Sequence, residues 1–89
     1  HDAVILDVRS PKEFERGFID GAINSNVDDL RQKLEELDRN RTYIIYCQVG
    51  LRGYLACRIL KNNGFEHIVN LNGGYNLWKT IYPQYILAE

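Results

Sequence analysis

The chain has no methionine, only two prolines, two cysteines and one tryptophan among its 89 residues. Because no initiator methionine is present, we expect the chain to be a piece of a longer protein. Cys47 and Cys57 lie ten residues apart and form no C-x-x-C pair, so we expect no zinc site. A chain with 45% hydrophobic residues does not need a disulfide to fold. These absences favour a reducing, cytoplasmic setting and a domain without a metal.

Long apolar runs and excess charge are absent too. The net charge is −1 and no lysine or arginine cluster stands out, which argues against nucleic acid or an anionic membrane as a partner. The longest apolar runs, at residues 3–6 and 43–47, have the length of a strand and are too short to cross a membrane. No signal peptide opens the chain. The length predicts a single domain over residues 1–89.

The hydrophobic pattern alternates between strand and helix periods. It predicts strands at residues 3–6, 22–24, 43–46 and 68–71, and helices at residues 11–16, 27–37, 51–62 and 75–81. Ser10 before Pro11 is typical of a helix start. The segment 27–37 has its leucines on one stripe and reads as an amphipathic α-helix. In the helix at 51–62 we expect Leu55, Ile59 and Leu60 to face inward.

Strands separated by helices predict an α/β fold, a central parallel sheet of four to five strands with helices on both faces. The usual site in such a fold is the crevice beyond the carboxyl ends of the strands. Cys47 follows the third predicted strand, and the segment from Asp7 to Arg9 follows the first. We therefore expect these residues to lie near one another.

The pattern C-x-x-G-x-R occupies residues 47–52, between a predicted strand and a predicted helix. A thiolate is the reactive form of cysteine, and a helix N-terminus stabilises it. Gly50 allows a backbone curl in which consecutive N–H groups surround the sulfur, and Arg52 adds a permanent planar cation. A cysteine that ends a buried strand is often a plain core residue, but this spacing favours a loop that holds a nucleophilic sulfur beside an anion.

Several segments together give a resemblance over essentially the whole chain. They are Asp7-Val8-Arg9, Glu13-Phe14, Gly17, Ile19, Gly21-Ala22-Ile23-Asn24, the cysteine loop, Leu71-Asn72-Gly73-Gly74-Tyr75 and Trp78. In these residues the chain resembles the rhodanese-like sulfurtransferases. The stretch from Cys47 to Tyr54, with Ala56, Arg58 and Gly64-Phe65, is most similar to the rhodanese domain at the C-terminal end of coenzyme A-disulfide reductase-type flavoproteins.

The resemblance implies that Cys47 carries sulfane sulfur as a persulfide and passes it to an acceptor thiol or to a fused reductase. It implies that the loop N–H groups and Arg52 bind this persulfide, with Gln48, Val49, Gly50, Leu51 and Gly53 as the substrate-binding loop. The donor would be thiosulfate, polysulfide or coenzyme A persulfide. FAD, NAD(P)H and coenzyme A would belong to the fused or partner flavoprotein, since no dinucleotide-binding glycine pattern occurs here.

Other residues near the loop have two readings each. The resemblance makes Asp7 and Arg9 chiefly scaffold for the loop. Cys57 is either a resolving cysteine or a packed helix residue, and packing is the simpler reading. Arg58 either meets a coenzyme A phosphate or is a solvated charge, and Tyr54 is a weak candidate for lining the pocket.

The chain departs from common rhodanese patterns at Phe18, where many relatives have histidine, and at Ser25-Asn26, where many have proline. Gln48 and Val49 are uncharged where several thiosulfate-using relatives place arginine, which favours polysulfide or coenzyme A persulfide as donor. Two other functions stay open. A docking module would share the fold without turnover, and a phosphatase or arsenate reductase would need the arginine six positions after the cysteine, whereas Arg52 is five after Cys47.

Overall fold

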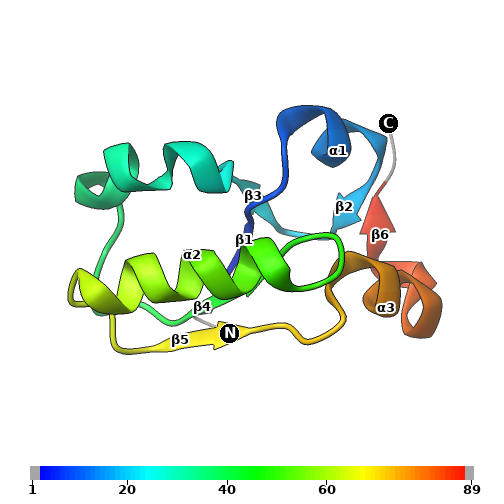
Figure 1. Cartoon of the computed structure of the whole chain (residues 1–89). Helices are drawn as coiled ribbons and strands as arrows, with labels where there is room; N and C mark the ends of the chain where they lie inside the picture. The colour runs from blue at the N-terminus through cyan, green and yellow to red at the C-terminus, as the bar shows by residue number, and fades with distance from the viewer. Residues whose placement is uncertain (1–2, 88–89) are drawn as a thin grey trace.

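The computed structural model describes residues 3–87 and shows an α/β fold (Figure 1). Its elements in chain order are β1 (Val4–Asp7), α1 (Pro11–Arg16), β2 (Phe18–Ile19), β3 (Ile23–Asn24), the 3-10 helix η1 (Val27–Glu36), β4 (Tyr43–Tyr46), α2 (Leu51–Asn62), β5 (Ile68–Asn70), α3 (Gly74–Ile81), the 3-10 helix η2 (Pro83–Tyr85) and β6 (Ile86–Leu87). No helix within residues 3–87 combines the length and the apolar character that a membrane span needs.

The main sheet has four parallel strands in the order β3-β1-β4-β5, which confirms the predicted fold class. Ile45 of β4 is paired with Leu6 of β1 on one side and with Asn70 of β5 on the other. The strands β2 and β6 form a separate antiparallel pair, with Phe18 opposite Leu87. The sequence analysis missed this second sheet, because two-residue strands are too short to show an alternating pattern.

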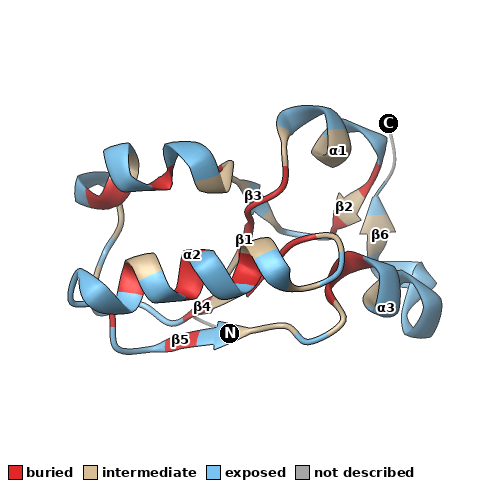
Figure 2. Cartoon of the chain, in the orientation of Figure 1, coloured by how far each residue is buried: buried red, intermediate tan, exposed pale blue. Residues whose placement is uncertain are grey.

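The buried residues form two separate cores, and Figure 2 shows buried segments in the strands, in α2 and at the start of α3. On one face, Tyr43 and Ile45 of β4 pack with α2 and η1 through residues such as Leu30 and Leu60. On the other face, Tyr46 packs with residues that include Tyr75 of α3. Successive β4 side chains alternate between these cores, so helices cover both faces as predicted.

Segment 27–36 is a 3-10 helix, so the expected α-helix is wrong in its hydrogen bonding. The expected inward stripe is right, because Leu30 and Leu34 are buried. The hydrophobic pattern does not distinguish the two helix types, since both bring residues three or four positions apart to neighbouring places on one side. The predicted buried face is thus correct, although the backbone hydrogen bonds join residues three positions apart instead of four.

The expected inward position of Leu55 is also wrong, because 45% of this side chain is exposed. The buried stripe of α2 consists of Gly53, Ala56, Cys57 and Leu60. These positions follow the i, i+3, i+4, i+7 spacing of a single helix face, and three of the four are small. The small residues let α2 lie close to the sheet, which leaves Leu55 on the outside and Ile59 partly buried.

Candidate functional site

The loop that follows β4 places Cys47 at the start of α2, as the sequence predicted. The Cys47 side chain is almost fully buried, with 1% of the residue exposed, and the Gly50 N–H donates to its Sγ at 3.0 Å. Gly50 is the N-cap of α2 and has φ 134°, a conformation that disfavours residues with a Cβ. A sulfur at a helix N-terminus with an N–H aimed at it is well placed to hold negative charge.

In the loop, hydrogen bonds hold the Gln48 side chain, whereas the side chains of Val49 and Leu51 are exposed. Gln48 accepts a hydrogen bond from Arg9 Nη1 at 3.0 Å and donates to Asn76 Oδ1 at 2.5 Å. Val49 and Leu51 are 62% and 68% exposed. The loop therefore combines one amide held by hydrogen bonds with two exposed apolar side chains.

The N-terminus of α3 holds the beginning of this loop. The backbone N–H groups of Tyr75 and Asn76 donate to the carbonyl oxygens of Cys47 and Gln48, at 2.8 and 3.1 Å. Gly74 has φ 59°, and a Cβ there would overlap the Cys47 carbonyl oxygen. The sequence analysis named Gly74 only as part of the family resemblance, because the loop that it contacts lies more than 20 residues away. Close approach of two backbones is why glycine is needed at position 74.

Arg52, the predicted cation of the loop, is held by a carboxylate that the sequence analysis did not single out. Its Nη1 and Nη2 donate to Glu13 Oε1 and Oε2 at 2.6 and 3.0 Å. Glu13 also accepts from the Ser10 N–H at 3.0 Å in a capping box that starts α1. The hydrogen bonds from Arg52 are the main reason that the Glu13 pKa falls to about 2. The S-x-x-E capping box was visible in the sequence, but the arginine it would meet was not.

Asp7 and Arg9 form a buried ion pair beside the loop, with Arg9 Nη2 2.7 Å from Asp7 Oδ2. The guanidinium also donates to the Gly17 carbonyl oxygen at 2.8 Å and to Gln48. Tyr75 offers its ring face to the same guanidinium, with the ring centroid 4.2 Å from Arg9 Cζ. The pair thus connects β1 to Gln48, as expected of scaffold residues near the loop.

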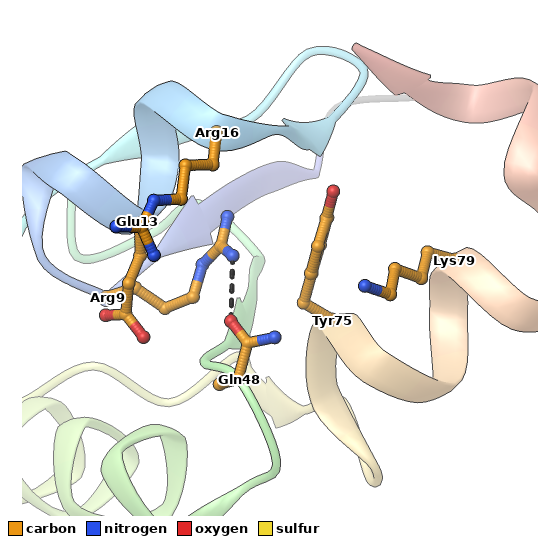
Figure 3. Close-up of a pocket in the computed structure, with 6 residues that line it drawn as sticks. All are labelled: Arg9, Glu13, Arg16, Gln48, Tyr75 and Lys79. Atoms are coloured by element: carbon orange, nitrogen blue, oxygen red, sulfur yellow. Dashed lines mark hydrogen bonds between the residues drawn. The ribbon is translucent and has the colours of Figure 1, made fainter. Parts of the chain in front are cut away.

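A cavity of about 250 Å³ lies beside the cysteine loop (Figure 3). Figure 3 shows Gln48 at its base, with the Arg9 and Glu13 side chains on one side and the Tyr75 ring and Lys79 on the other. The lining residues are Arg9, Glu13, Arg16, Gln48, Tyr75 and Lys79. The sequence analysis did not identify Arg16 and Lys79, because they come from two helices far apart in the chain.

The remaining candidates lie farther along α2. Gly53 is buried, and a Cβ on it would meet the Asn70 side chain. Tyr54 is 51% exposed and carries the Arg58 guanidinium near its ring, with Cζ 5.9 Å from the centroid. Arg58 lines a different cavity, between η1 and α2. Cys57 is a buried free thiol whose pKa is raised by burial, so its placement fits a packing role.

Within the part of the chain that the structure describes, no group of three or more histidine, cysteine, aspartate or glutamate side chains is arranged to hold a metal ion. The contacts around Cys47 bring together one thiol, one helix N-terminus and several fixed charges. This set suits covalent chemistry on sulfur next to an anion.

Comparison with known families and proteins gives a consistent result. Residues 1–81 match the family model of the Rhodanese-like domain. The uncharacterized protein YqhL of Bacillus subtilis is 40% identical over 76 residues, which cover 85% of this chain and 60% of that protein. The thiosulfate sulfurtransferase GlpE of Pseudomonas syringae is 30% identical over 82 residues, which cover 92% of this chain and 77% of that protein.

Solved structures agree with these relatives. The chain is 40% identical to the reduced Bacillus anthracis CoADR-RHD, with a TM-score of 0.89 over 96% of this chain and 15% of that one. It is 28% identical to the rhodanese-like domain of the Anabaena protein Alr3790, with a TM-score of 0.91 over the whole of this chain and 67% of that one. The chain thus spans 60% of the length of YqhL and a small part of CoADR-RHD.

Proposed function

The chain belongs to the rhodanese-like family, and from that premise we propose that it is a sulfurtransferase domain that carries sulfane sulfur on Cys47. The observation that supports this best is the placement of Cys47 Sγ, at the N-terminus of α2 with the Gly50 N–H 3.0 Å away. Relatives named sulfurtransferase or thiosulfate sulfurtransferase cover most of the chain, which supports the same activity.

The proposed reaction has two steps that need no separate oxidant. In the first, the Cys47 thiolate attacks the outer sulfur of the donor, a new S–S bond forms to Cys47, and the rest of the donor leaves with the electron pair of its broken bond. In the second, an acceptor thiolate attacks the outer sulfur of the persulfide, and Cys47 leaves again as a thiolate. Covalent catalysis of this kind divides one transfer into two easier ones.

The other loop residues have proposed supporting roles. The Gly50 N–H donates to the sulfur, and we propose that the neighbouring N–H groups of the loop join it around the persulfide. Arg52 favours the negative charge of the persulfide, and Glu13 fixes where that guanidinium lies. Gly53 keeps the first turn of α2 clear of Asn70.

The donor and acceptor follow from the resemblance rather than from the geometry. We propose a polysulfide or coenzyme A persulfide as donor, with thiosulfate as the third candidate, because Gln48 and Val49, the two residues directly after Cys47, are uncharged. The likeness to CoADR-RHD supports a larger protein in which this domain passes sulfur to a flavoprotein reductase. FAD, NAD(P)H and coenzyme A would be bound by that reductase, and the protein would work in the cytoplasm.

One observation favours a second candidate, a docking module without turnover. The exposed side chains of Val49, Leu51 and Tyr54 form an apolar rim at the start of α2, which suits contact with another protein. A sulfur carrier that meets a protein acceptor would use the same rim. The sulfurtransferase and the docking module differ in one observable, which is whether Cys47 gains a sulfur atom from a donor.

The test is intact-mass spectrometry of the purified domain after exposure to thiosulfate, polysulfide or coenzyme A persulfide. We expect the mass to increase by one sulfur atom in the wild type and in Cys57→Ser, and to stay unchanged in Cys47→Ser. A gain that persists in Cys47→Ser and disappears in Cys57→Ser would move the carrier to Cys57. No gain from any donor would favour the docking module.

A further inference from the structure

The cavity beside the cysteine loop contains two cations that have no acidic partner. Asp7 neutralises Arg9, and Arg52 neutralises Glu13. The two remaining charged lining residues are Arg16 and Lys79, and neither forms an ion pair with any residue that the structure describes. Both are exposed, so the cavity has a local excess of positive charge, whereas the whole chain has a net charge of −1.

Arg16 and Lys79 come from opposite sides of the cavity. Arg16 is in the last turn of α1 and Lys79 is in the last turn of α3. The Lys79 ammonium lies 5.4 Å from the centroid of the Tyr75 ring, and Figure 3 shows this ring between Lys79 and Arg9. An anion in the cavity would therefore lie in the positive field of two helix ends, Arg16 from α1 and Lys79 from α3.

The cavity adjoins the beginning of the loop. Gln48, which follows Cys47 directly, forms part of the wall, and Glu13 on the same wall holds Arg52 at the end of the loop. Gln48 is fixed by its bonds to Arg9 and Asn76. A molecule whose sulfur reacts at Cys47 would thus meet the cavity at Gln48, the residue that follows the cysteine.

The volume of the cavity limits what it can hold. At about 250 Å³ it is below the usual range for a complete small-molecule site, roughly 300–1,000 Å³, but it exceeds the space of several waters at about 30 Å³ each. It suits one charged group of a larger molecule. A phosphate fits two cations well, because it carries up to two negative charges and accepts the forked hydrogen bonds of arginine.

We infer that this cavity binds an anionic group, of the phosphate class, on the molecule that carries sulfur to or from Cys47. The inference rests on the proposed sulfur transfer and adds a specificity for the carrier. In thiosulfate the charged sulfonate group is bonded directly to the transferred sulfur. A phosphorylated thiol persulfide would place its charge outside the loop, where Arg16 and Lys79 lie.

Two donors that differ only in one phosphate test this inference. They are 4′-phosphopantetheine persulfide and pantetheine persulfide, which have the same reacting sulfur and the same arm. For the wild type we expect a KM several-fold lower with the phosphorylated donor. Arg16→Gln and Lys79→Gln should each raise that KM by about two- to fivefold, as is typical of exposed charge contacts, and leave the pantetheine KM unchanged.

Lys61→Gln is the matched control, since it removes one exposed charge from the last turn of α2, outside the cavity. It should leave both KM values unchanged. The preference of the wild type should also decrease as salt is added, because exposed charges are screened. Equal KM values for the two donors would overturn the inference while the proposed sulfur transfer still stands. The same holds if the double variant Arg16→Gln/Lys79→Gln still prefers the phosphorylated donor.

A binding measurement keeps the two proposals separate. S-methyl-4′-phosphopantetheine cannot donate sulfur, so calorimetric titration with it reports the anion site alone. We expect it to bind the wild type more tightly than S-methylpantetheine does, and to lose this advantage in the double variant Arg16→Gln/Lys79→Gln. If neither persulfide transfers sulfur but this difference is found, the proposed function fails and the anion site remains. If the difference is not found, the inference is refuted.

Discussion

Glu13 connects the start of α1 to the end of the cysteine loop, so Glu13→Gln is a direct test of how the loop is held. Glutamine is also found at this position of a capping box, so the helix start should survive the change. The charge that meets Arg52 at 2.6 and 3.0 Å would be lost. The variant therefore removes the ion pair and leaves the cap largely intact.

The size of the effect follows from the lowered pKa of Glu13. A fall from 4.5 to about 2 corresponds to about 3 kcal/mol of stability at neutral pH, at about 1.4 kcal/mol per pH unit. The side chains of Arg52 and Glu13 are 36% and 28% exposed, so solvent screens part of this interaction. After that reduction we expect Glu13→Gln to lower the free energy of unfolding by about 1–2 kcal/mol at pH 7.

The pH dependence identifies the charge as the cause. Because the pKa of Glu13 is lower in the folded state, its contribution is fully present above about pH 4.5 and is lost as the pH falls toward 2. The free-energy difference between wild type and Glu13→Gln should therefore stay nearly constant from pH 7 to about pH 5 and then shrink toward pH 3, when urea unfolding is followed by circular dichroism.

Glu15→Gln is the control, because Glu15 is an exposed acid on the same helix. It should change stability by less than about 0.5 kcal/mol at every pH. A loss in Glu13→Gln that is equal at pH 7 and pH 3 would refute the reasoning, since it would show that the shape of the side chain matters and its charge does not. Combining Glu13→Gln with Arg52→Ala should cost little more than either change alone.

Three further predictions concern the frame around the loop. Asp7→Asn should cost about 3–5 kcal/mol in urea unfolding, because it leaves the buried Arg9 without its counter-charge, whereas a loss below about 1 kcal/mol would mean that water or another group replaces it. Gly74→Ala should cost about 2 kcal/mol or more, since φ is 59° and the new Cβ would overlap a loop carbonyl oxygen, and unchanged stability and sulfur loading would contradict this close approach. Leu60→Ala should cost about 2–5 kcal/mol and Leu55→Ala less than about 0.5 kcal/mol, because Leu60 is fully buried and Leu55 is not; equal losses would contradict the described packing of α2.

Much of the fold was predictable because buried strands and helix starts leave local signals. Residues 43–46 are a continuous apolar run, and they form β4 at the centre of the sheet. Ser10-Pro11 predicted the start of α1, and the structure has both the cap and the proline there. The orientation of α2 was predicted less well, because small residues such as Ala56 and Cys57 define its buried face while the larger Leu55 is exposed. Size alone is a poor guide where a helix lies close to a sheet.

The site was predictable where its residues are neighbours in the chain or follow parallel strands of the sheet, as Arg9 and Gln48 do. The pattern from Cys47 to Arg52 marked the loop, and the structure places it at a helix start. Its long-range supports were not visible, because Glu13 lies 39 residues from Arg52. The same holds for the N–H groups of α3 that bind the loop. Contacts between distant segments depend on the sheet order, which hydrophobic periodicity alone does not specify.

Arg9 gives the beginning of the loop an unusual rigidity for a binding segment. It joins β1, the end of α1 and Gln48, and its guanidinium lies against the Tyr75 ring of α3. Binding loops often belong to the least stable parts of a protein and open without global unfolding. Here, moving Gln48 would break contacts to several elements at once. We therefore expect sulfur to be taken up without a loop opening, and changes in substrate range to arise at Val49 and Leu51, whose side chains can be replaced without disturbing the frame.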